Sequence, residues 1–384
     1  MDNKKNGIPK LRFPGFTGAW EQRKLGEITK THSLKQYISE AFDHGKYMVI
    51  QQGENPIAGY ANGDPFENFK DVTLFGDHTL SLFKPQEKFF VASDGIKILS
   101  PSLKMNGMFY YYLLEKYRPQ SEGYKRHFTI MKKSTALFPI EIDEQIKISN
   151  FLKELDSLIA LHQRKLEHLQ EQKKGLLQKM FPKNGETVPE VRFPGFTDAW
   201  EQRKLGDFII EFHEKTTVND QYPILTSSRK GIFLQTDYYS GNQIASKDNT
   251  GYNIVPFGYF TYRHMSDDNI FRFNINKIVD KGIVSTLYPV FTTNKYLDSR
   301  YLQIQLNHGN EFAKYALLQK QGGSRTYMYL SKLKKLVLTM PKSTSEQKTI
   351  SNFFDTLDSL ITLHQRKLEH LELMKKGLLQ QMFV

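Results

Sequence analysis

The 384-residue sequence contains no cysteine. Disulfide frameworks, thiolate zinc sites and a cysteine nucleophile are therefore excluded, and a reducing, cytoplasmic compartment is favoured. No run of 18 or more apolar residues occurs, and the N-terminal stretch MDNKKNGIPKLRF has no apolar segment of the signal-peptide kind. We therefore expect a cytoplasmic protein that neither crosses a membrane nor is exported.

The motifs of several enzyme classes are absent as well. The sequence has no GxxxxGK[ST] phosphate loop, no GxGxxG turn, no HExxH zinc motif and no GxSxG elbow. Residues 171–173 and 346–348 match the ExK text of a nuclease motif, but both lie in or at the start of segments predicted to be long helices. We interpret them as chance matches. The sequence predicts a non-catalytic chain with no catalytic residues and no metal ligands.

Acidic residues are in deficit. Lysine and arginine number 53 against 41 acids, which gives a net charge of +12, and the excess is spread along the chain. A field of this sign attracts a polyanion such as nucleic acid. With 39% hydrophobic and 13% aromatic residues, the chain is able to bury substantial cores, and its length suits two domains.

Two segments of the sequence each occur twice. RFPGFTGAWEQRKLG from Arg12 recurs from Arg192 with one difference, Gly18 against Asp198, and the 38 residues from Glu144 recur in similar form from Glu346. We call these four segments the frame. The intervening variable segment 1 (27–143) and variable segment 2 (207–345) show no obvious resemblance to each other. The chain is thus two copies of one plan with different contents.

The chain ends resemble a cut copy of its centre. The central junction reads LLQKMFPKNGETVPEVRFPGF, whereas the chain finishes with LLQQMFV and starts with MDNKKNGIPKLRFPGF. This pattern indicates a cyclic arrangement of two units opened at one connector. It predicts that the two ends lie near one another.

The longer repeat predicts a helix of about 38 residues with a heptad seam, because seam positions recur in alternating steps of four and three. The first seam comprises Ile148, Leu152, Leu155, Ile159, His162, Leu166, Leu169, Lys173, Leu176 and Met180, and the second Ile350, Phe354, Leu357, Ile361, His364, Leu368, Leu371, Lys375, Leu378 and Met382. We predict that the two helices form an antiparallel coiled coil, with an intermolecular coiled coil as the alternative. The seam histidines are interpreted as polar residues that set the register, with ligands or pH sensors as alternatives. Leu158 and Leu360 widen the apolar face enough to pack against a globular domain or another subunit.

The variable segments are predicted to be rich in strands, because apolar runs such as KYMVIQQG and GYNIVPFGYFTYR are punctuated by Gly, Asn and Asp. Short helices are expected around 108–117 and 299–306. The predicted fold class is α+β, with two mixed α/β domains separated by the coiled coil and related by a pseudo-two-fold axis. The predicted ranges are domain 1 at 1–143, helix 1 at 144–182, domain 2 with its connector at 183–345, and helix 2 at 346–384.

Each variable segment ends in a basic, aromatic loop, YKRHFTIMKKS in the first and KQGGSRTYMYLSKLKK in the second. Such loops supply donors for phosphate oxygens and side chains for base edges. The candidate DNA contacts of segment 1 are Gln51, Gln52, Asn55, Tyr60, His78, Lys97, Tyr124, Lys125, Arg126 and His127. Those of segment 2 are Ser228, Arg229, Lys230, Gln235, Lys247, Tyr262, Arg263, His264, Ser324, Arg325 and Tyr327.

The paired RFPGFTxAWEQRKLG peptides, the paired EQxxISNF…LHQRKLEHL…KKGLLQxMF helices and the unlike segments between them resemble the specificity subunit of type I restriction-modification systems. The resemblance spans the whole chain. The run GGSRxYxxL…LVLTMP…EQ from Gly322 resembles the end of a target recognition domain of this family. Segment 1 departs there, since EGYKRHFTIMKKSTALFPIEIDEQ lacks the double glycine.

The resemblance implies two target recognition domains that each read half of a bipartite, asymmetric double-stranded DNA sequence, with the helices as spacer. It implies docking to two modification subunits, which use S-adenosylmethionine, and to two ATP-dependent restriction subunits. S-adenosylmethionine, ATP and Mg are then expected in those partners and not on this chain. We assign partner docking mainly to the frame, including Trp20, Trp200 and the outer helix faces, and expect the two tryptophans to anchor packing or partner contacts and not to touch bases. The alternatives are a coiled-coil scaffold that binds proteins, and a fused nuclease or methyltransferase with unrecognised motifs.

Overall fold

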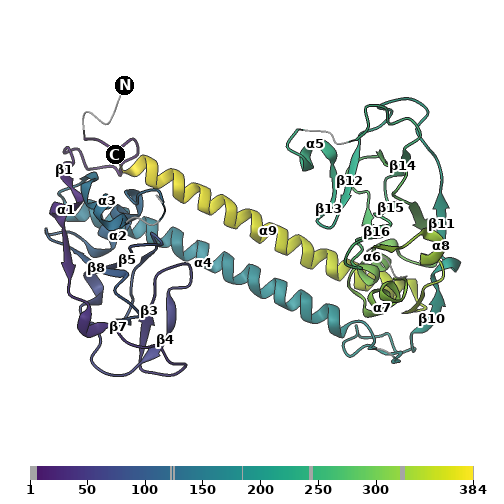
Figure 1. The fold of residues 1–384 in the computed structure, drawn as a ribbon, viewed down its shortest axis with the longest axis horizontal. Helices are drawn as coiled ribbons and strands as arrows, with labels where there is room; N and C mark the ends of the chain where they lie inside the picture. The colour runs from purple at the N-terminus through teal and green to yellow at the C-terminus, as the bar shows by residue number, and fades with distance from the viewer. Residues whose placement is uncertain are drawn as a thin grey trace. The chain divides into compact units, whose positions relative to one another are not determined.

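The structure is a computed structural model that describes residues 7–121, 123, 126–183, 185–241, 245–320 and 325–383. Its contacts divide the chain into two compact units. Unit 1 comprises Met1–Lys165 and His364–Val384, and unit 2 comprises Leu166–Leu363. The two long helices, α4 (Ile142–Lys179) and α9 (Thr344–Met382), each contribute one half to each unit (Figure 1).

In the residues that the structure describes, unit 1 contains three small sheets and three helices of its own. The first sheet is an antiparallel pair of β1 (Glu21–Lys24) and β9 (Thr135–Phe138). The second has four strands in the order β2 (Thr29–His32), β8 (Ile96–Pro101), β5 (Thr73–Gly76) and β6 (Leu82–Phe83). The third has three strands in the order β4 (Ile57–Ala61), β3 (Tyr47–Ile50) and β7 (Phe89–Val91). The helices are α1 (Leu25–Ile28), α2 (Gly107–Lys116) and α3 (His127–Lys133), with 3-10 turns η2 (Lys35–Tyr37) and η3 (Phe69–Asp71). Only the β3 and β7 pairing is parallel among the named strands of this unit.

Unit 2 has a strand pair equivalent to the β1–β9 pair of unit 1, but its other sheets differ from those of unit 1. The pair is β10 (Glu201–Lys204) with β21 (Val337–Met340), and the four-stranded sheet runs β11 (Ile209–Phe212), β19 (Val290–Thr293), β15 (Phe260–Thr261), β17 (Asn274–Ile275). Three two-stranded pairs follow: β12 (Leu225–Ser228) with β13 (Gly231–Leu234), β14 (Asn253–Pro256) with β18 (Lys281–Val284), and β16 (Met265–Ser266) with β20 (Thr326–Tyr327). The helices are α5 (Gln235–Tyr238), α6 (Ser299–His308), α7 (Asn310–Leu318) and α8 (Leu330–Leu333), with one 3-10 turn, η4 (Leu205–Asp207). The prediction of mixed α/β domains joined to two long helices is confirmed, and α2 and α6 lie where short helices were expected.

The heptad seam accounts for the burial pattern of the long helices. In unit 1 the start of α4 packs with the end of α9, since Ile148 and Leu152 share a buried cluster with Leu379 and Met382. In unit 2 the end of α4 packs with the start of α9, since Leu176 packs against the buried cluster that contains Ile350 and Phe354. The half-helices therefore run antiparallel within each unit, as predicted.

The seam histidines contact each other in unit 1. The Nδ1 atoms of His162 and His364 lie 2.8 Å apart, so one ring donates a hydrogen bond to the other. Burial and the nearby charge of His364 both lower the pKa of His162, which favours the neutral ring that this bond requires. The contact is consistent with the predicted role of setting the register.

A buried carboxylate joins each short frame segment to the long helix that follows it. In unit 1 the Glu144 carboxylate accepts two hydrogen bonds from the Arg12 guanidinium, at 2.7 and 2.8 Å, and one from the Trp20 indole N–H at 3.3 Å. Arg12 and Glu144 are almost completely removed from solvent, with side-chain exposures of 12% and 1%. A buried ion pair of this kind is costly to break because either partner alone is left unpaired. We call this cluster the clamp.

The clamp recurs in unit 2 with the same bonds. Arg192 donates to Glu346 at 2.7 and 2.8 Å, and the Trp200 indole donates to Glu346 at 3.1 Å. Trp20 and Trp200 are only 5% and 2% exposed. Of the two roles predicted for these tryptophans, packing or partner contact, the structure confirms packing, because each indole is buried and its N–H donates to a carboxylate within its own unit.

The two ends of the chain are hydrogen-bonded to each other in unit 1 in the same way as the two sides of the central junction in unit 2. The Leu11 amide donates to the Gln381 carbonyl at 2.9 Å, and at the equivalent frame positions the Val191 amide donates to the Lys179 carbonyl at 2.9 Å. The predicted proximity of the two ends is confirmed for the described residues. The same joint is made once between chain ends and once through a continuous connector.

Candidate nucleic-acid interface

Four chain segments of variable segment 1 are joined into one polar surface. The turn after β3 bonds to the turn after β5, because the His78 amide donates to the Gln52 side-chain carbonyl at 3.3 Å. The Asp77 amide donates to the Gly95 carbonyl at 2.8 Å, and the Asp77 carboxylate accepts the Phe128 amide at 2.8 Å. These bonds bring together the turns at 51–55, 77–81 and 93–95 and the start of α3.

Two glycines make this approach possible. A Cβ on Gly76 would lie 2.5 Å from the Ser81 hydroxyl and 2.7 Å from the Gln52 side chain, and a Cβ on Gly95 would lie 2.6 Å from the Gln52 amide nitrogen. All three distances are shorter than ordinary contacts, so a larger residue at either position would displace the Gln52 or Ser81 side chain. The Gln52 side chain is thereby held at the centre of this surface.

Several of the predicted contacts of segment 1 lie on this surface. Gln51, Gln52, Asn55, His78 and Arg126 belong to its turns and to the residue before α3, and the Lys97 ammonium donates to the Asp94 carbonyl at 2.9 Å. Surface polar groups on turns held by a rigid sheet suit readout of nucleic acid. We call this group the segment 1 surface.

The remaining predicted contacts of segment 1 are placed differently. The His127 ring is completely buried and bonds to the Asp77 carbonyl at 2.9 Å, so it has no free surface with which to meet DNA. Tyr60 is exposed, but it stands on β4, where it pairs with Phe42. Tyr124 and Lys125 lie outside the described residues.

Variable segment 2 presents a groove of about 350 Å³ beside the turn between β12 and β13. Four predicted contacts line it, namely Ser228, Arg229, Lys230 and Arg263. The turn is held by the buried Asn274, whose amide donates to the Ser227 hydroxyl at 2.8 Å and the Ser228 carbonyl at 2.9 Å. A basic groove with fixed walls suits a phosphate backbone or a base edge.

Two arginines near the groove are held by neighbouring aspartates. Arg229 donates to both carboxylate oxygens of Asp268, at 2.8 and 2.5 Å, and Arg325 donates to Asp267 at 2.8 Å. Hydrogen bonds from Arg229 and from Ser266 lower the pKa of Asp268 to about 2, so this carboxylate is ionised at neutral pH. In the free chain these guanidinium groups are pre-oriented but partly neutralised.

An aromatic stack lies on strand β20 and the residues after it. The rings of Tyr327 and Tyr329 are nearly parallel with centroids 5.9 Å apart, and His264 stacks on Tyr329 at 5.1 Å. Tyr327 and Tyr329 are 37% and 49% exposed, whereas His264 is buried and also bonds to the Leu287 carbonyl. Exposed stacked rings of this kind are typical of surfaces that bind nucleic acid.

The other predicted contacts of segment 2 are not gathered at the groove. Tyr262 is completely buried and its hydroxyl donates to the Met328 carbonyl at 2.8 Å, so its role is in the core. The Gln235 side chain accepts the Ala245 amide at 2.9 Å and so shapes a loop, while Lys247 is exposed beyond it. Ser324 lies outside the described residues.

Three tyrosines and an arginine are among the groove residues that were not predicted from the sequence. Tyr238, Tyr239, Tyr288 and Arg272 line the same groove as Arg229. Arg272 keeps a buried Nε with no hydrogen-bond partner among the described residues, which leaves a donor in the groove wall. The DYY run at 237–239 was a visible aromatic signal, but Arg272 sits in an ordinary apolar alternation that gave no indication of this position.

Neither a metal centre nor a membrane span is found in the described part of the chain. Within it, no group of three or more potential ligands is placed to hold a metal ion. No helix there is both long and apolar enough to cross a bilayer.

A repeated frame that carries two unlike mixed α/β segments, each with a polar and basic surface, defines a two-domain DNA-recognition protein. The sequence profile of the family described as "Type I restriction modification DNA specificity domain" matches residues 18–171 and again residues 197–373. The chain therefore belongs to this family. The prediction of a non-catalytic DNA-specificity subunit is confirmed by this membership.

Solved structures are similar at low sequence identity. The S subunit of a type-I restriction-modification system from M. genitalium is 14% identical, with a TM-score of 0.63 over 98% of this chain and 99% of that chain. The HsdS subunit from Thermoanaerobacter tengcongensis is 14% identical, with a TM-score of 0.43 over 99% and 97%. The first likeness shows a shared fold. A search of curated proteins finds no match.

Proposed function

We propose that the chain reads a bipartite, asymmetric DNA sequence in the cytoplasm, with each variable segment recognising one half. The observation that carries the proposal is the contrast within the chain. The clamp bonds recur with nearly the same lengths in both units, whereas the surfaces of the two variable segments share neither residues nor local topology. Two unlike surfaces on one repeated frame suit a target with two different halves.

We further propose that the frame presents equivalent surfaces to two modification subunits and, through them, to two restriction subunits. Two copies of one partner require two matching sites, which a duplicated frame supplies. S-adenosylmethionine, ATP and Mg would then be bound by those partners. The long helices would act as the spacer between the two halves of the target, since a helix of about 38 residues spans roughly 57 Å.

The test is to co-express the chain with its modification subunit and to sequence the methylated adenines. A split, asymmetric motif is expected. Replacing residues 27–143 with the corresponding segment of another family member is expected to change only one half of that motif. Methylation without a split motif, or a change in both halves after the replacement, would contradict the proposal.

A second experiment addresses the spacer. Inserting four residues, about one helical turn, near Leu166 is expected to lengthen the unread gap without altering either half of the motif. Matched insertion near Leu368 in the other helix, and both insertions together, serve as controls for disruption of the pairing. An unchanged gap in a folded, active complex would contradict the spacer role.

A further inference from the structure

The two copies of the long frame helix are closely similar, and two of their differences lie where each helix meets its variable segment. They differ at ten of 38 positions. Two neighbouring differences are Leu152 and Lys153 in α4 against Phe354 and Asp355 in α9. These positions lie one turn or less before Asp156 and Asp358, the aspartates through which each helix bonds to its own variable segment.

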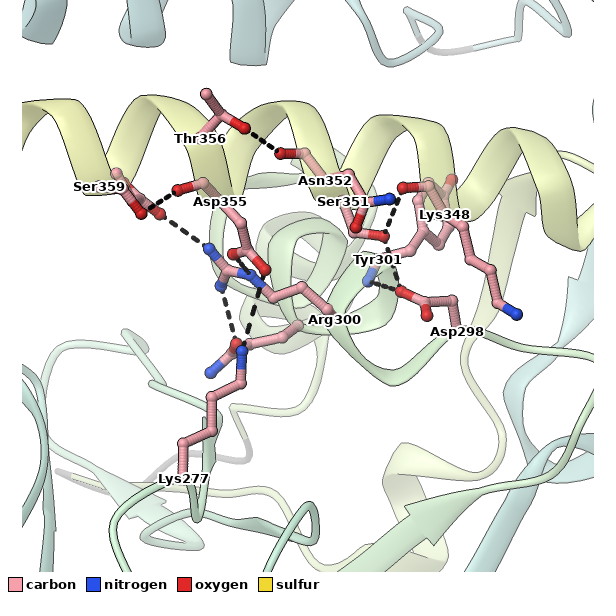
Figure 2. Close-up of polar contacts among 12 residues, drawn as sticks. Lys277, Asp298, Arg300, Tyr301, Lys348, Ser351, Asn352, Asp355, Thr356 and Ser359 are labelled. Atoms are coloured by element: carbon pink, nitrogen blue, oxygen red, sulfur yellow. Dashed lines mark hydrogen bonds and ion pairs between the residues drawn. The ribbon is translucent and has the colours of Figure 1, made fainter.

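In unit 2 the contact is an ion-pair network. The Arg300 guanidinium, near the start of α6, donates to Asp355 at 2.5 Å and to Asp358 at 2.7 Å, and a third nitrogen donates to Gln303 at 2.8 Å (Figure 2). Lys277 adds a weaker contact to Asp355 at 3.9 Å. Arg300 is 22% exposed, so the network is partly shielded from solvent. Asp355 is thus used by two cations of variable segment 2.

The helix that corresponds to α6 in unit 1 is α2. Asn106 caps α2, and its backbone N–H donates to the Gln145 side chain at 2.8 Å. Asp298 caps α6, and its backbone N–H donates to the Gln347 side chain at the same distance. Two residues after each cap stand Met108 in α2 and Arg300 in α6. The equivalence is therefore fixed by bonds that both units share.

At this joint, unit 1 keeps Asp156 as the equivalent of Asp358 but lacks both partners of the Arg300–Asp355 pair of unit 2. Met108 packs against the apolar cluster of its unit, and the position equivalent to Asp355 is the exposed Lys153. The variable segment contributes an acid instead, because Glu115 bonds to Lys375 at 2.8 Å. Variable segment 1 thus offers an anion, and variable segment 2 offers a cation, to the same frame.

The neighbouring position shows the same matching in volume. Six residues after the cap, α2 has Tyr112 and α6 has Ile304. The buried cluster that contains Tyr112 also contains Leu152, and the cluster that contains Ile304 also contains Phe354. The cluster with the larger residue of the variable segment therefore has the smaller residue at this frame position, and the other cluster has the opposite combination, as expected where a core is filled to a constant density.

We propose that residues 152–153 and 354–355 form a compatibility code that decides which variable segment each copy of the frame accepts. A segment with an arginine two residues after the helix cap is stabilised by Asp355 and opposed by Lys153. A segment with methionine two residues after the helix cap has no charge at this position, so both copies of the frame accept it. Exchange of variable segments through the nearly identical repeats is therefore asymmetric, because only one direction creates a like-charge contact.

The first test uses the full-length chain. Asp355→Lys makes the frame of unit 2 resemble that of unit 1 and opposes Arg300. We expect hydrogen exchange in α6 to accelerate about tenfold, as for loss of a partly shielded ion pair. Adding Arg300→Met, which copies the joint of unit 1, is expected to restore at least half of the lost protection. Lys153→Asp is the matched control and is expected to leave exchange in α2 unchanged.

An unchanged α6 in Asp355→Lys, or a double variant no better protected than the single one, would overturn the proposal. The second test replaces residues 27–143 with a second copy of 207–345, which places an arginine opposite Lys153. Lys153→Asp is expected to raise the melting temperature of this chimaera and not that of the natural chain. Equal effects in both proteins would also overturn it. Neither readout depends on the DNA sequence recognised, so failure here is distinguishable from failure of the proposed function.

Discussion

The two units hold the same frame by the same bonds but attach their variable segments by opposite charges. Each clamp joins arginine to glutamate at 2.7 and 2.8 Å. In contrast, Glu115 of unit 1 bonds to a frame lysine, whereas Arg300 of unit 2 bonds to frame aspartates. The difference shows that the two copies of the frame share their internal contacts and the bond to each helix cap, from Asn106 to Gln145 and from Asp298 to Gln347. The charged contacts to the variable segments differ.

The largest expected effect falls on the shared clamp. Glu144→Ala leaves the Arg12 guanidinium buried without its carboxylate, and Glu346→Ala does the same to Arg192. We expect each to destabilise its own unit by about 3–5 kcal/mol, the typical effect of removing one partner of a buried pair. Denaturant unfolding followed by hydrogen exchange of peptides from each unit measures this.

The exposed Glu154 supplies the control, and Glu154→Ala is expected to change stability by less than about 0.5 kcal/mol. Similar losses at both clamps would support the equivalence of the two frame copies. If one clamp proved dispensable, the two copies would not be mechanically equivalent.

The clamp also illustrates what the sequence was able to predict. Repetition and heptad spacing were enough to predict the frame, the long helices and their antiparallel pairing, because these depend on periodic burial. Packing was one of two roles predicted for Trp20, but its bond to Glu144 was not predicted, because nothing in the sequence marks Glu144 as buried. An acid at the start of a helix is ordinarily solvated, and its distant arginine partner is 132 residues away.

The candidate interface was predicted less well, for a related reason. Basic and aromatic residues mark a loop that binds nucleic acid, but they also fill cores. Tyr262 and His127 were predicted as contacts because they are aromatic or basic, but both are buried. Arg272 was not predicted, yet it lines the groove. Which side of a short strand faces the solvent depends on sheet pairing between distant segments, which no local pattern specifies.

An intermediate effect is expected to distinguish the two units at equivalent lysines. Lys375 bonds to Glu115 and Asp156, both at 2.8 Å, and these carboxylates raise its pKa although burial acts to lower it. Lys375→Met therefore leaves two acids without that cation. Lys173 bonds to Asp358, which keeps Arg300 as a second partner after Lys173→Met. We expect losses of about 2–3 and about 1 kcal/mol respectively, by analogy with partly buried pairs.

Chemical denaturation of the two single variants decides this comparison. Adding Arg300→Met to Lys173→Met is expected to bring the loss in unit 2 up to that of Lys375→Met. Equal losses of stability in the two single lysine variants would mean that Arg300 does not compensate for the missing lysine at Asp358.

A smaller effect, confined to binding, is expected at the groove of segment 2. Arg229→Ala and Arg325→Ala remove guanidinium groups from a surface and should barely alter folding. We expect each to weaken DNA binding by about 1–3 kcal/mol if it contacts a base edge, with relaxed specificity in one half of the target only. Lys97→Ala in the segment 1 surface is the matched variant for the other half. Methylated-site sequencing with the modification subunit reads both halves together, and a change in the half assigned to segment 1 after Arg229→Ala would contradict the assignment.

The smallest effect on the isolated chain is expected at the exposed frame leucines. Leu158 and Leu360 are 46% and 39% exposed and occupy equivalent positions, one in each unit. Serine at either site should change the free energy of unfolding by no more than about 0.5 kcal/mol, because little apolar area is buried there. If the frame presents matching surfaces to two partners, each single variant loses one copy of the modification subunit and the double variant loses both. Native mass spectrometry of the co-expressed complex counts the copies, and full occupancy in the double variant would place partner docking elsewhere on the frame.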